Sequence, residues 1–308
     1  MPLVSYDKPA LTFEDQLDQL IRRGLVVEDR ARALSVLERV SYYRLSAYWH
    51  PFRRPTESGV PSDDFVKGTS FDRAVVLYEL DRELRVLFFD AIERVEIALR
   101  TAVTYALGHA FGAFAHMDAK NFESPRAFDH AEWLVALRKE SERAKETFVE
   151  HYRQKYEGFP KLPIWMASEL IAFGTLSKLF AMMPADQKST IAKQWGFSAG
   201  DAESFIHALS HIRNICAHHG RLWNRVLGVR PKFPNGQGRW PEQIDNSRVY
   251  FLLYLLRHVT RTDERCDAWA MRLFDLLDRQ ASGILRAMGA PEDWRAHPLW
   301  SDVKAARL

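Results

Sequence analysis

An all-α fold is predicted by three features of the 308-residue sequence. Apolar residues recur at helical spacing along most of the chain, and no convincing run alternates apolar with polar residues. Residues 69–107 contain neither glycine nor proline. A single helix over that run would be ~58 Å long at 1.5 Å per residue, and two helices joined by a kink fit equally well.

The elements before that run are predicted from capping residues and spacing. Thr12 with Asp15 resembles a capping box, and Gly24 stands where the first helix would stop. A second helix is expected over residues 29–40, and the aromatic segment 41–49 follows it directly. Residues 51–68 are predicted to form a loop because they hold three prolines and two glycines. Further helices are expected near residues 129–155, 164–182, 186–195, 199–217, 246–262 and 264–288.

Three parts of the chain are expected from this pattern. Residues 1–68 form an N-terminal helical region, residues 69–227 a helical body, and residues 228–308 a loop followed by a C-terminal helical pair. The boundary is placed at residues 228–241, which contain three prolines and three glycines. The apolar face of the first C-terminal helix predicts that the pair packs back onto the body.

A cytoplasmic location is expected from the two cysteines and the N-terminus. Cys216 and Cys266 are far apart and form no metal-like spacing, which favours reduced thiols. Acidic residues occur early in the sequence, so no signal peptide is expected. The longest apolar stretch without Lys, Arg, Asp or Glu is residues 101–117, shorter than the ~20 residues that a membrane span needs.

Charge is concentrated in one window of an almost neutral chain. The total formal charge is +3, but residues 211–240 carry +6 without a single acidic residue, which leaves −3 for the rest. A solvated face that pairs with acids elsewhere is the simple interpretation. A site for an anion such as phosphate is the alternative, because the planar guanidinium of arginine suits phosphate. The six basic residues are Arg213, Arg221, Arg225, Arg230, Lys232 and Arg239.

Within this window lies the pattern Arg213-Asn214-x-x-x-His218. A histidine exchanges a proton near neutral pH, and an adjacent arginine and asparagine can hold a phosphate and stabilise charge on its oxygens. These groups suffice for metal-free RNA cleavage by attack of the 2′-hydroxyl on the neighbouring phosphorus. The products would be a 2′,3′-cyclic phosphate and a 5′-hydroxyl end.

The same pattern resembles the R-x(4–6)-H motif of the HEPN superfamily of helical ribonucleases. The wider sequence resembles the Abi family of bacterial abortive-infection proteins, of the AbiD/AbiF type, over roughly residues 15–225. The resemblance rests on five blocks: Ser41–Ser46 with Tyr48, Tyr78–Arg85, Ala91–Glu96, Pro163-x-Trp165 with Phe173–Ser177, and Arg213–Asn224. Within the first block, Ala47 stands where a glycine is expected.

This resemblance implies a HEPN-like helical bundle, RNase activity against RNA during phage infection, and a homodimer that brings two copies of the motif together. It also implies that a structured non-coding RNA can restrain the protein. Arg213 and His218 would be the catalytic pair, with Asn214 in support and no cofactor. The charge further suggests His219, Arg221 and Arg225 as phosphate contacts.

Helix geometry raises an objection, because Arg213 and His218 are ~140° apart around an ideal helix. The reach of arginine, fraying before Gly220 or the motif of a second protomer would each resolve it, and we favour the dimer. His207, His211 and His218 also share one stripe, and Glu203 lies one turn earlier. No carboxylate completes an H-E-x-x-H pattern, so we expect no metal and place these histidines near an RNA groove.

Aromatic residues offer a second candidate RNA contact. Tyr43 could stack on a base while Arg44 binds phosphate, although aromatics this dense more often form core. Trp165, Phe173 and Trp223 are predicted to be core, and the acidic residues between 79 and 96 mostly a solvated or salt-bridged helix face. RNA binding without cleavage, and a protein–protein scaffold in phage sensing, remain the alternative functions.

Overall fold

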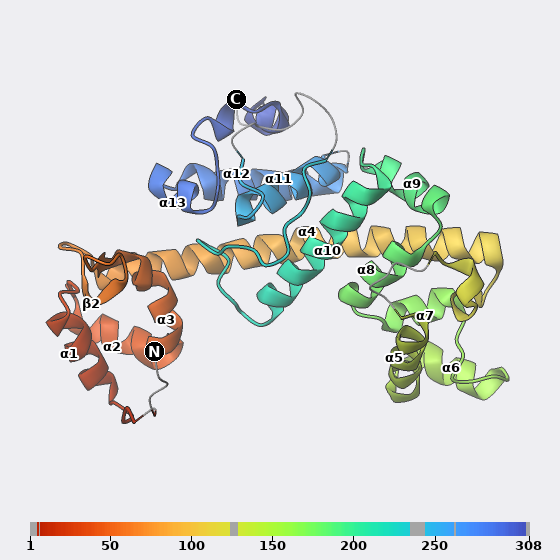
Figure 1. Cartoon of the computed structure of the whole chain (residues 1–308), viewed down its shortest axis with the longest axis horizontal. Helices are drawn as coiled ribbons and strands as arrows, with labels where there is room; N and C mark the ends of the chain where they lie inside the picture. The colour runs from red at the N-terminus through yellow and green to blue at the C-terminus, as the bar shows by residue number, and fades with distance from the viewer. Residues whose placement is uncertain (1–4, 6, 124–128, 235–243, 262, 306–308) are drawn as a thin grey trace. The chain divides into compact units, whose positions relative to one another are not determined.

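The computed structural model describes residues 5, 7–123, 129–234, 244–261 and 263–305. It is mostly helical, as predicted, and divides into two compact units, residues 1–84 and 85–308 (Figure 1). The three-part organisation expected from the sequence stays a prediction. Among the described residues, none of the helices combines the length and the hydropathy that a bilayer span requires.

The first unit begins with the predicted capped helix. The Thr12 hydroxyl accepts a hydrogen bond from the Asp15 backbone N–H at 3.1 Å and donates one to the Asp15 carboxylate at 2.9 Å. The elements of this unit are α1 (Phe13–Arg22), α2 (Arg30–Val40), α3 (Tyr42–Trp49), a 3₁₀ turn (His50–Phe52), β1 (Arg53–Pro55), β2 (Pro61–Phe65) and the first turns of α4 (Phe71–Phe111).

The two strands correct the prediction of a loop over residues 51–68. β1 and β2 pair antiparallel, with Arg53 opposite Phe65. Ion pairs join the strands, from Arg53 to Asp63 at 3.1 Å and from Arg54 to Asp64 at 2.6 Å. Neither strand alternates apolar with polar residues, which is the pattern from which strands are predicted. Cross-strand charge pairs stabilise the hairpin instead.

The core of the first unit holds a buried carboxyl group. Tyr48, Trp49 and Asp81 are all almost completely buried. The Tyr48 hydroxyl donates a hydrogen bond of 2.7 Å to the Asp81 carboxylate. Asp81 is thus buried, whereas the acidic residues between 79 and 96 are expected mostly on a solvated or salt-bridged face. The hydrogen bond offsets part of the cost of burying this polar group.

The long run without glycine or proline is a single helix, α4, which begins in the first unit and continues into the second. The second unit also contains α5 (His130–Arg143), α6 (Thr147–Lys155), α7 (Ile164–Leu170), α8 (Phe173–Met182), α9 (Ala185–Gln194), α10 (Ala199–Ala217), α11 (Val249–Thr260), α12 (Asp267–Asp278), α13 (Ser282–Ala287), α14 (Ser301–Ala305) and short 3₁₀ turns (Ala115–Met117, Ala119–Asn121, Glu264–Cys266, Trp294–Ala296 and Pro298–Trp300).

Three of the predicted helices are each divided into two shorter helices in the structure. The breaks lie between α5 and α6, between α7 and α8, and between α12 and α13. At the first break Ala144 and Glu146 are extended, and at the second Ile171 and Ala172 are extended. None of these residues is glycine or proline, so the breaks leave no local signal.

The C-terminal helices pack against the middle of α4. The indole N–H of the buried Trp269 donates a 2.8 Å hydrogen bond to the Leu87 carbonyl oxygen, and Arg272 forms an ion pair with Asp90. α11 is buried almost all round, which is typical of a helix in the centre of a domain. The motif helix α10 contacts α8, α9 and α11.

Candidate functional site

The motif lies at the C-terminal end of α10. Ser198 caps the start of this helix, accepting from the Asp201 N–H at 3.2 Å and donating to the Asp201 carboxylate at 2.6 Å. Phe205, Leu209 and Ile212 are buried, and they hold one face of α10 in the core. The opposite face is therefore left for the polar residues of the motif.

That outer face carries an exposed polar stripe. His207, His211, Asn214 and His218 are all exposed, and their spacing of four, three and four residues places them on one side of the helix. Arg213 is half-buried beside the stripe. The structure therefore brings Asn214 and His218 together on one face, and it places Arg213 on the flank.

The helix ends abruptly in a Schellman motif. The His219 N–H donates to the Cys216 carbonyl oxygen at 3.0 Å, and the Gly220 N–H donates to the Ile215 carbonyl oxygen at 2.7 Å. His219 occupies the left-handed position with φ of 54°, where glycine is more usual. α10 stays helical through Ala217, so fraying within the motif does not bring its arginine and histidine together.

Gly220 is needed at this point because there is no room for a side chain. A Cβ atom there would lie 2.9 Å from Ile215 Cγ2 and 3.2 Å from the Ile215 carbonyl oxygen. The Gly220 carbonyl oxygen also accepts a 3.4 Å hydrogen bond from Arg85, which is buried on α4. The end of the motif is thus closely packed on its inner side.

The segment after the motif is braced by the C-terminal part of the unit. Arg225 Nε donates to the Arg221 carbonyl oxygen at 2.6 Å. Arg248 donates to Asn224 Oδ1 at 3.1 Å, and the Trp223 indole N–H donates to the Ile284 carbonyl oxygen at 3.3 Å. Arg221 and Arg225 are both half-buried. The arginines suggested as phosphate contacts therefore lie on a supported loop.

The positive charge of this region has no acidic counterpart in the described part of the window, residues 211–234. Arg213, Asn214 and His218 make no side-chain hydrogen bond and no ion pair with any residue that the structure describes. Arg239, the last basic residue of the window, lies outside the described residues. The three motif side chains are thus available to an external ligand.

Two histidines on the stripe form an edge-to-face pair. The ring centroids of His207 and His211 are 4.9 Å apart, with the planes at 89°. Burial lowers the pKa of His207, and the neighbouring His211 and Lys178 lower it further against the opposing effect of Glu203. No group of three or more His, Cys, Asp and Glu side chains that could hold a metal ion occurs among the described residues.

The aromatic segment supplies one exposed ring. Tyr43 is 88% exposed on α3, and Arg44 beside it is also exposed. Tyr48 and Trp49 are buried, as expected for core aromatics. Tyr43 and Arg44 belong to the first unit, so they form a candidate contact separate from the motif of the second unit.

The prediction that Trp165 is core is wrong. Phe173 and Trp223 are buried as predicted, whereas Trp165 is 51% exposed at the start of α7. The adjacent Ile164 and nearby Ala167 take the buried positions of this short helix. A glutamate at position 169, one turn after the tryptophan, is the sequence signal that marks this face as exposed.

One comparison with known proteins gives a match. A family model described as Abi-like protein matches residues 35–224, more than half of the chain. The matched region runs from α2 to the loop after α10, and it includes the aromatic segment, α7 and the whole Arg-Asn-x-x-x-His pattern. Comparison with curated proteins and with solved structures returns no match.

Proposed function

The chain belongs to the Abi-like protein family, and from this premise we propose that it is a metal-independent endoribonuclease of the HEPN type. Family membership points to a role in abortive infection, the defence of bacteria against phage, and it is compatible with a nuclease. The substrate proposed is RNA, and the products are a 2′,3′-cyclic phosphate and a 5′-hydroxyl end.

The observation that carries the proposal is the state of the motif side chains. Arg213, Asn214 and His218 sit at the end of one helix without side-chain partners among the described residues, in a window with basic residues and no acidic ones. Structural arginines usually find a carboxylate, whereas phosphate-binding arginines keep their donors for the ligand. An external polyanionic ligand therefore explains this arrangement better than an acidic partner segment within the same unit.

Cleavage requires that one proton is removed from the 2′-hydroxyl and that one is added to the 5′ oxygen. The His218 imidazole removes the proton of the 2′-hydroxyl as its oxygen attacks phosphorus, the P–O5′ bond breaks, and the leaving 5′ oxygen takes a proton from solvent water. Arg213 stabilises the negative charge that develops on the phosphoryl oxygens, and Asn214 donates from the same face. No oxidant, reductant or bound cofactor is needed for the balance.

We place the two catalytic groups in different protomers of a homodimer. The regular helix through Ala217 separates Arg213 from His218 around the axis, so one phosphate is served better by groups from two copies. Mixing Arg213→Ala protein with His218→Ala protein tests this directly. Partial recovery of activity in the mixed dimer supports a shared site, and no recovery places both groups in one protomer.

Cleavage is tested with purified protein and single-stranded RNA in the presence of EDTA. His218→Ala and Arg213→Ala should each lower the rate at least ~100-fold, the usual contribution of a general acid–base or an oxyanion stabiliser. His151→Ala is the matched control, because His151 is an exposed histidine on α6, outside the motif and its stripe. Equal rates for wild type and His218→Ala would refute the proposal.

RNA binding without cleavage is the second candidate, and the separation of Arg213 from His218 around α10 favours it. In that case the protein would retain a structured RNA intact, and Tyr43 and Arg44 would add a stacking and a phosphate contact. Intact RNA that co-purifies with the protein and survives long incubation in EDTA would select this function over catalysis.

A further inference from the structure

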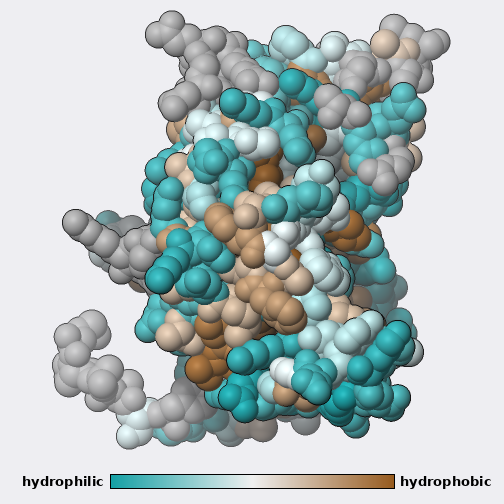
Figure 2. Space-filling view, turned by 90° about the vertical axis from the view of Figure 1, so that its right-hand side faces the viewer, coloured by the Kyte–Doolittle hydropathy of each residue, from teal (hydrophilic) through white to brown (hydrophobic). Residues whose placement is uncertain are grey.

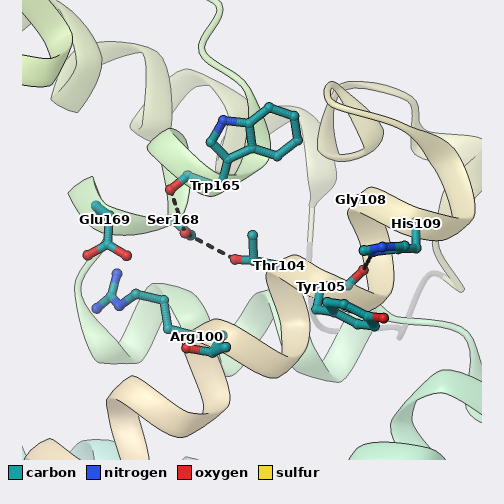
Figure 3. A pocket seen from close by; sticks show the side chains of 9 residues that line it. Arg100, Thr104, Tyr105, Gly108, His109, Trp165, Ser168 and Glu169 are labelled. Carbon is teal, nitrogen blue, oxygen red and sulfur yellow. Dashed lines mark hydrogen bonds between the residues drawn. The ribbon is translucent and has the colours of Figure 1, made fainter.

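A pocket of about 420 Å³ lies between α4 and α7, apart from the motif residues (Figure 3). α4 contributes Thr101, Thr104, Tyr105 and Gly108, and α7 contributes Trp165, Ser168 and Glu169. Figure 2 shows that apolar side chains gather on the face of the molecule at the right of Figure 1. Tyr105 of α4 and Trp165 of α7 are both large hydrophobic residues that are exposed to solvent.

Two aromatic surfaces border this pocket. Trp165 is 51% exposed, and its ring reaches the backbone of α4 at Gly108, where a Cβ atom would lie 4.0 Å from Trp165 Cζ3. Tyr105 is 66% exposed and lies against His109, with ring centroids 3.9 Å apart. Exposed aromatic rings of this kind cost solvation energy and provide stacking surfaces for a planar ligand.

The polar groups of the pocket include a carboxylate and a guanidinium that face each other (Figure 3). Glu169 is exposed one helical turn after Trp165, and it makes no hydrogen bond or ion pair with any residue that the structure describes. Arg100 is fixed by Glu96 at 2.7 Å and by the Ile171 carbonyl oxygen at 3.3 Å. The Arg100 charge is therefore held in place and largely offset by Glu96.

The floor of the pocket is also fixed. The Thr104 hydroxyl donates to Ser168 Oγ at 3.1 Å and so ties α4 to α7 (Figure 3). The pocket thus combines a rigid floor, aromatic borders and a carboxylate with unused acceptor capacity. A small planar molecule with two adjacent donors would complement it best, because a carboxylate accepts two parallel hydrogen bonds.

From this arrangement we propose that the pocket between α4 and α7 binds a guanine base, stacked on Trp165 with its N1–H and N2 amino group donating to Glu169. Guanine presents two neighbouring donors beside the O6 acceptor on its Watson–Crick edge. Adenine, cytosine and uracil do not present that pair of donors to one carboxylate.

The base has two chemical sources, a free guanine nucleotide or an unpaired guanosine of an RNA. The RNA source rests on the proposed function, and there the pocket would select guanosine-containing single strands. The nucleotide source is independent of it. None of the motif residues lines the pocket, so a His218→Ala variant should bind guanine as wild type does.

The test measures binding of GMP, IMP and AMP to the full chain by calorimetry. GMP should bind at least ~10-fold more tightly than IMP, which lacks the N2 amino group, because one hydrogen bond to a charged acceptor is lost. Glu169→Gln should abolish this preference, while Trp165→Ala weakens all three nucleotides and Trp165→Phe retains most of the stacking. Glu146→Gln, an exposed glutamate outside the pocket, is the matched control and should match wild type.

The RNA source is tested with hexamers of uridine with and without one central guanosine, on the His218→Ala background so that the strand survives. A preference for the guanosine hexamer that Glu169→Gln removes, without measurable GMP binding, identifies RNA as the source. Tight GMP binding identifies the nucleotide. Equal affinity for GMP and AMP together with equal affinity for the two hexamers, or a guanine preference that survives Glu169→Gln, overturns the proposal whatever the outcome for cleavage.

Discussion

Alanine at position 220 tests whether close packing at the end of α10 sets the geometry of the motif. The backbone of Gly220 is not in the left-handed region, so alanine alone would add ~0.4–1 kcal/mol by restricting the unfolded chain. The new Cβ, however, would lie 2.9 Å from Ile215 Cγ2 and 3.2 Å from the Ile215 carbonyl oxygen. Overpacking of this kind costs ~1–3 kcal/mol, so we expect a net loss of about 1–2 kcal/mol.

Gly228→Ala is the matched control for this substitution. Gly228 is exposed, its backbone is also outside the left-handed region, and a Cβ there meets nothing within 4 Å. The free energy of unfolding should therefore rise slightly or stay unchanged. Thermal unfolding should show Gly220→Ala melting ~2–8 °C below wild type and Gly228→Ala at or above it.

The functional consequence is measured on the same proteins. Relief of the Ile215 contact needs a shift of the turn that holds His218 and His219, so RNA cleavage by Gly220→Ala should fall further than its remaining folded fraction explains. Gly220→Ala with wild-type stability, or an equal loss in Gly228→Ala, would show that the packing argument is wrong.

Three further predictions concern the effects of buried and exposed side chains on stability and on RNA binding. Tyr48→Phe should cost ~1.5–3 kcal/mol of unfolding free energy because it removes the hydrogen bond to the buried Asp81, whereas Tyr43→Ala should leave stability unchanged and weaken RNA binding; chemical denaturation and RNA titration measure both. Burial and the nearby positive charge of His130 lower the pKa of His116 to about 4, below its usual 6.5, so the folded chain binds fewer protons than the unfolded one between these values. Stability is therefore full above about pH 6.5 and falls towards pH 4 by at most about 3 kcal/mol, and denaturation of His116→Phe should lose this pH dependence. Arg213→Ala should reduce the slope of log affinity against log salt by about 1, while an unchanged slope would show that Arg213 contacts no phosphate.

The helices could largely be predicted from the sequence, because apolar spacing and caps reflect local forces. Thr12, Ser198 and the absence of glycine and proline over residues 69–107 each act within a few residues of their own position. The hairpin of β1 and β2 could not be predicted, since its strands are joined by arginine–aspartate pairs instead of an apolar face.

The face on which Asn214 and His218 lie could be predicted from the sequence, whereas the contacts that shape the end of the motif could not. The spacing of Asn214 and His218 places them on one face, as the structure confirms, because that relation depends only on the helix. The turn at His219 and the support of Asn224 by Arg248 depend on contacts with residues distant in sequence. The exposure of Trp165 likewise depends on which side of α7 faces α4, and Glu169, one turn later, is the one local indication of the exposed side that we identify.

The chemistry of the RNA ends is the most direct measurement of the proposed activity. Purified wild-type protein is incubated with single-stranded RNA in EDTA, and the fragments are mapped with ligation chemistry that distinguishes 2′,3′-cyclic phosphate from 3′-hydroxyl ends. Cyclic phosphate and 5′-hydroxyl ends are expected with wild type and His151→Ala, and they should be absent with His218→Ala. RNA that stays intact with wild type, or 3′-hydroxyl ends that persist with His218→Ala, would contradict the proposed activity.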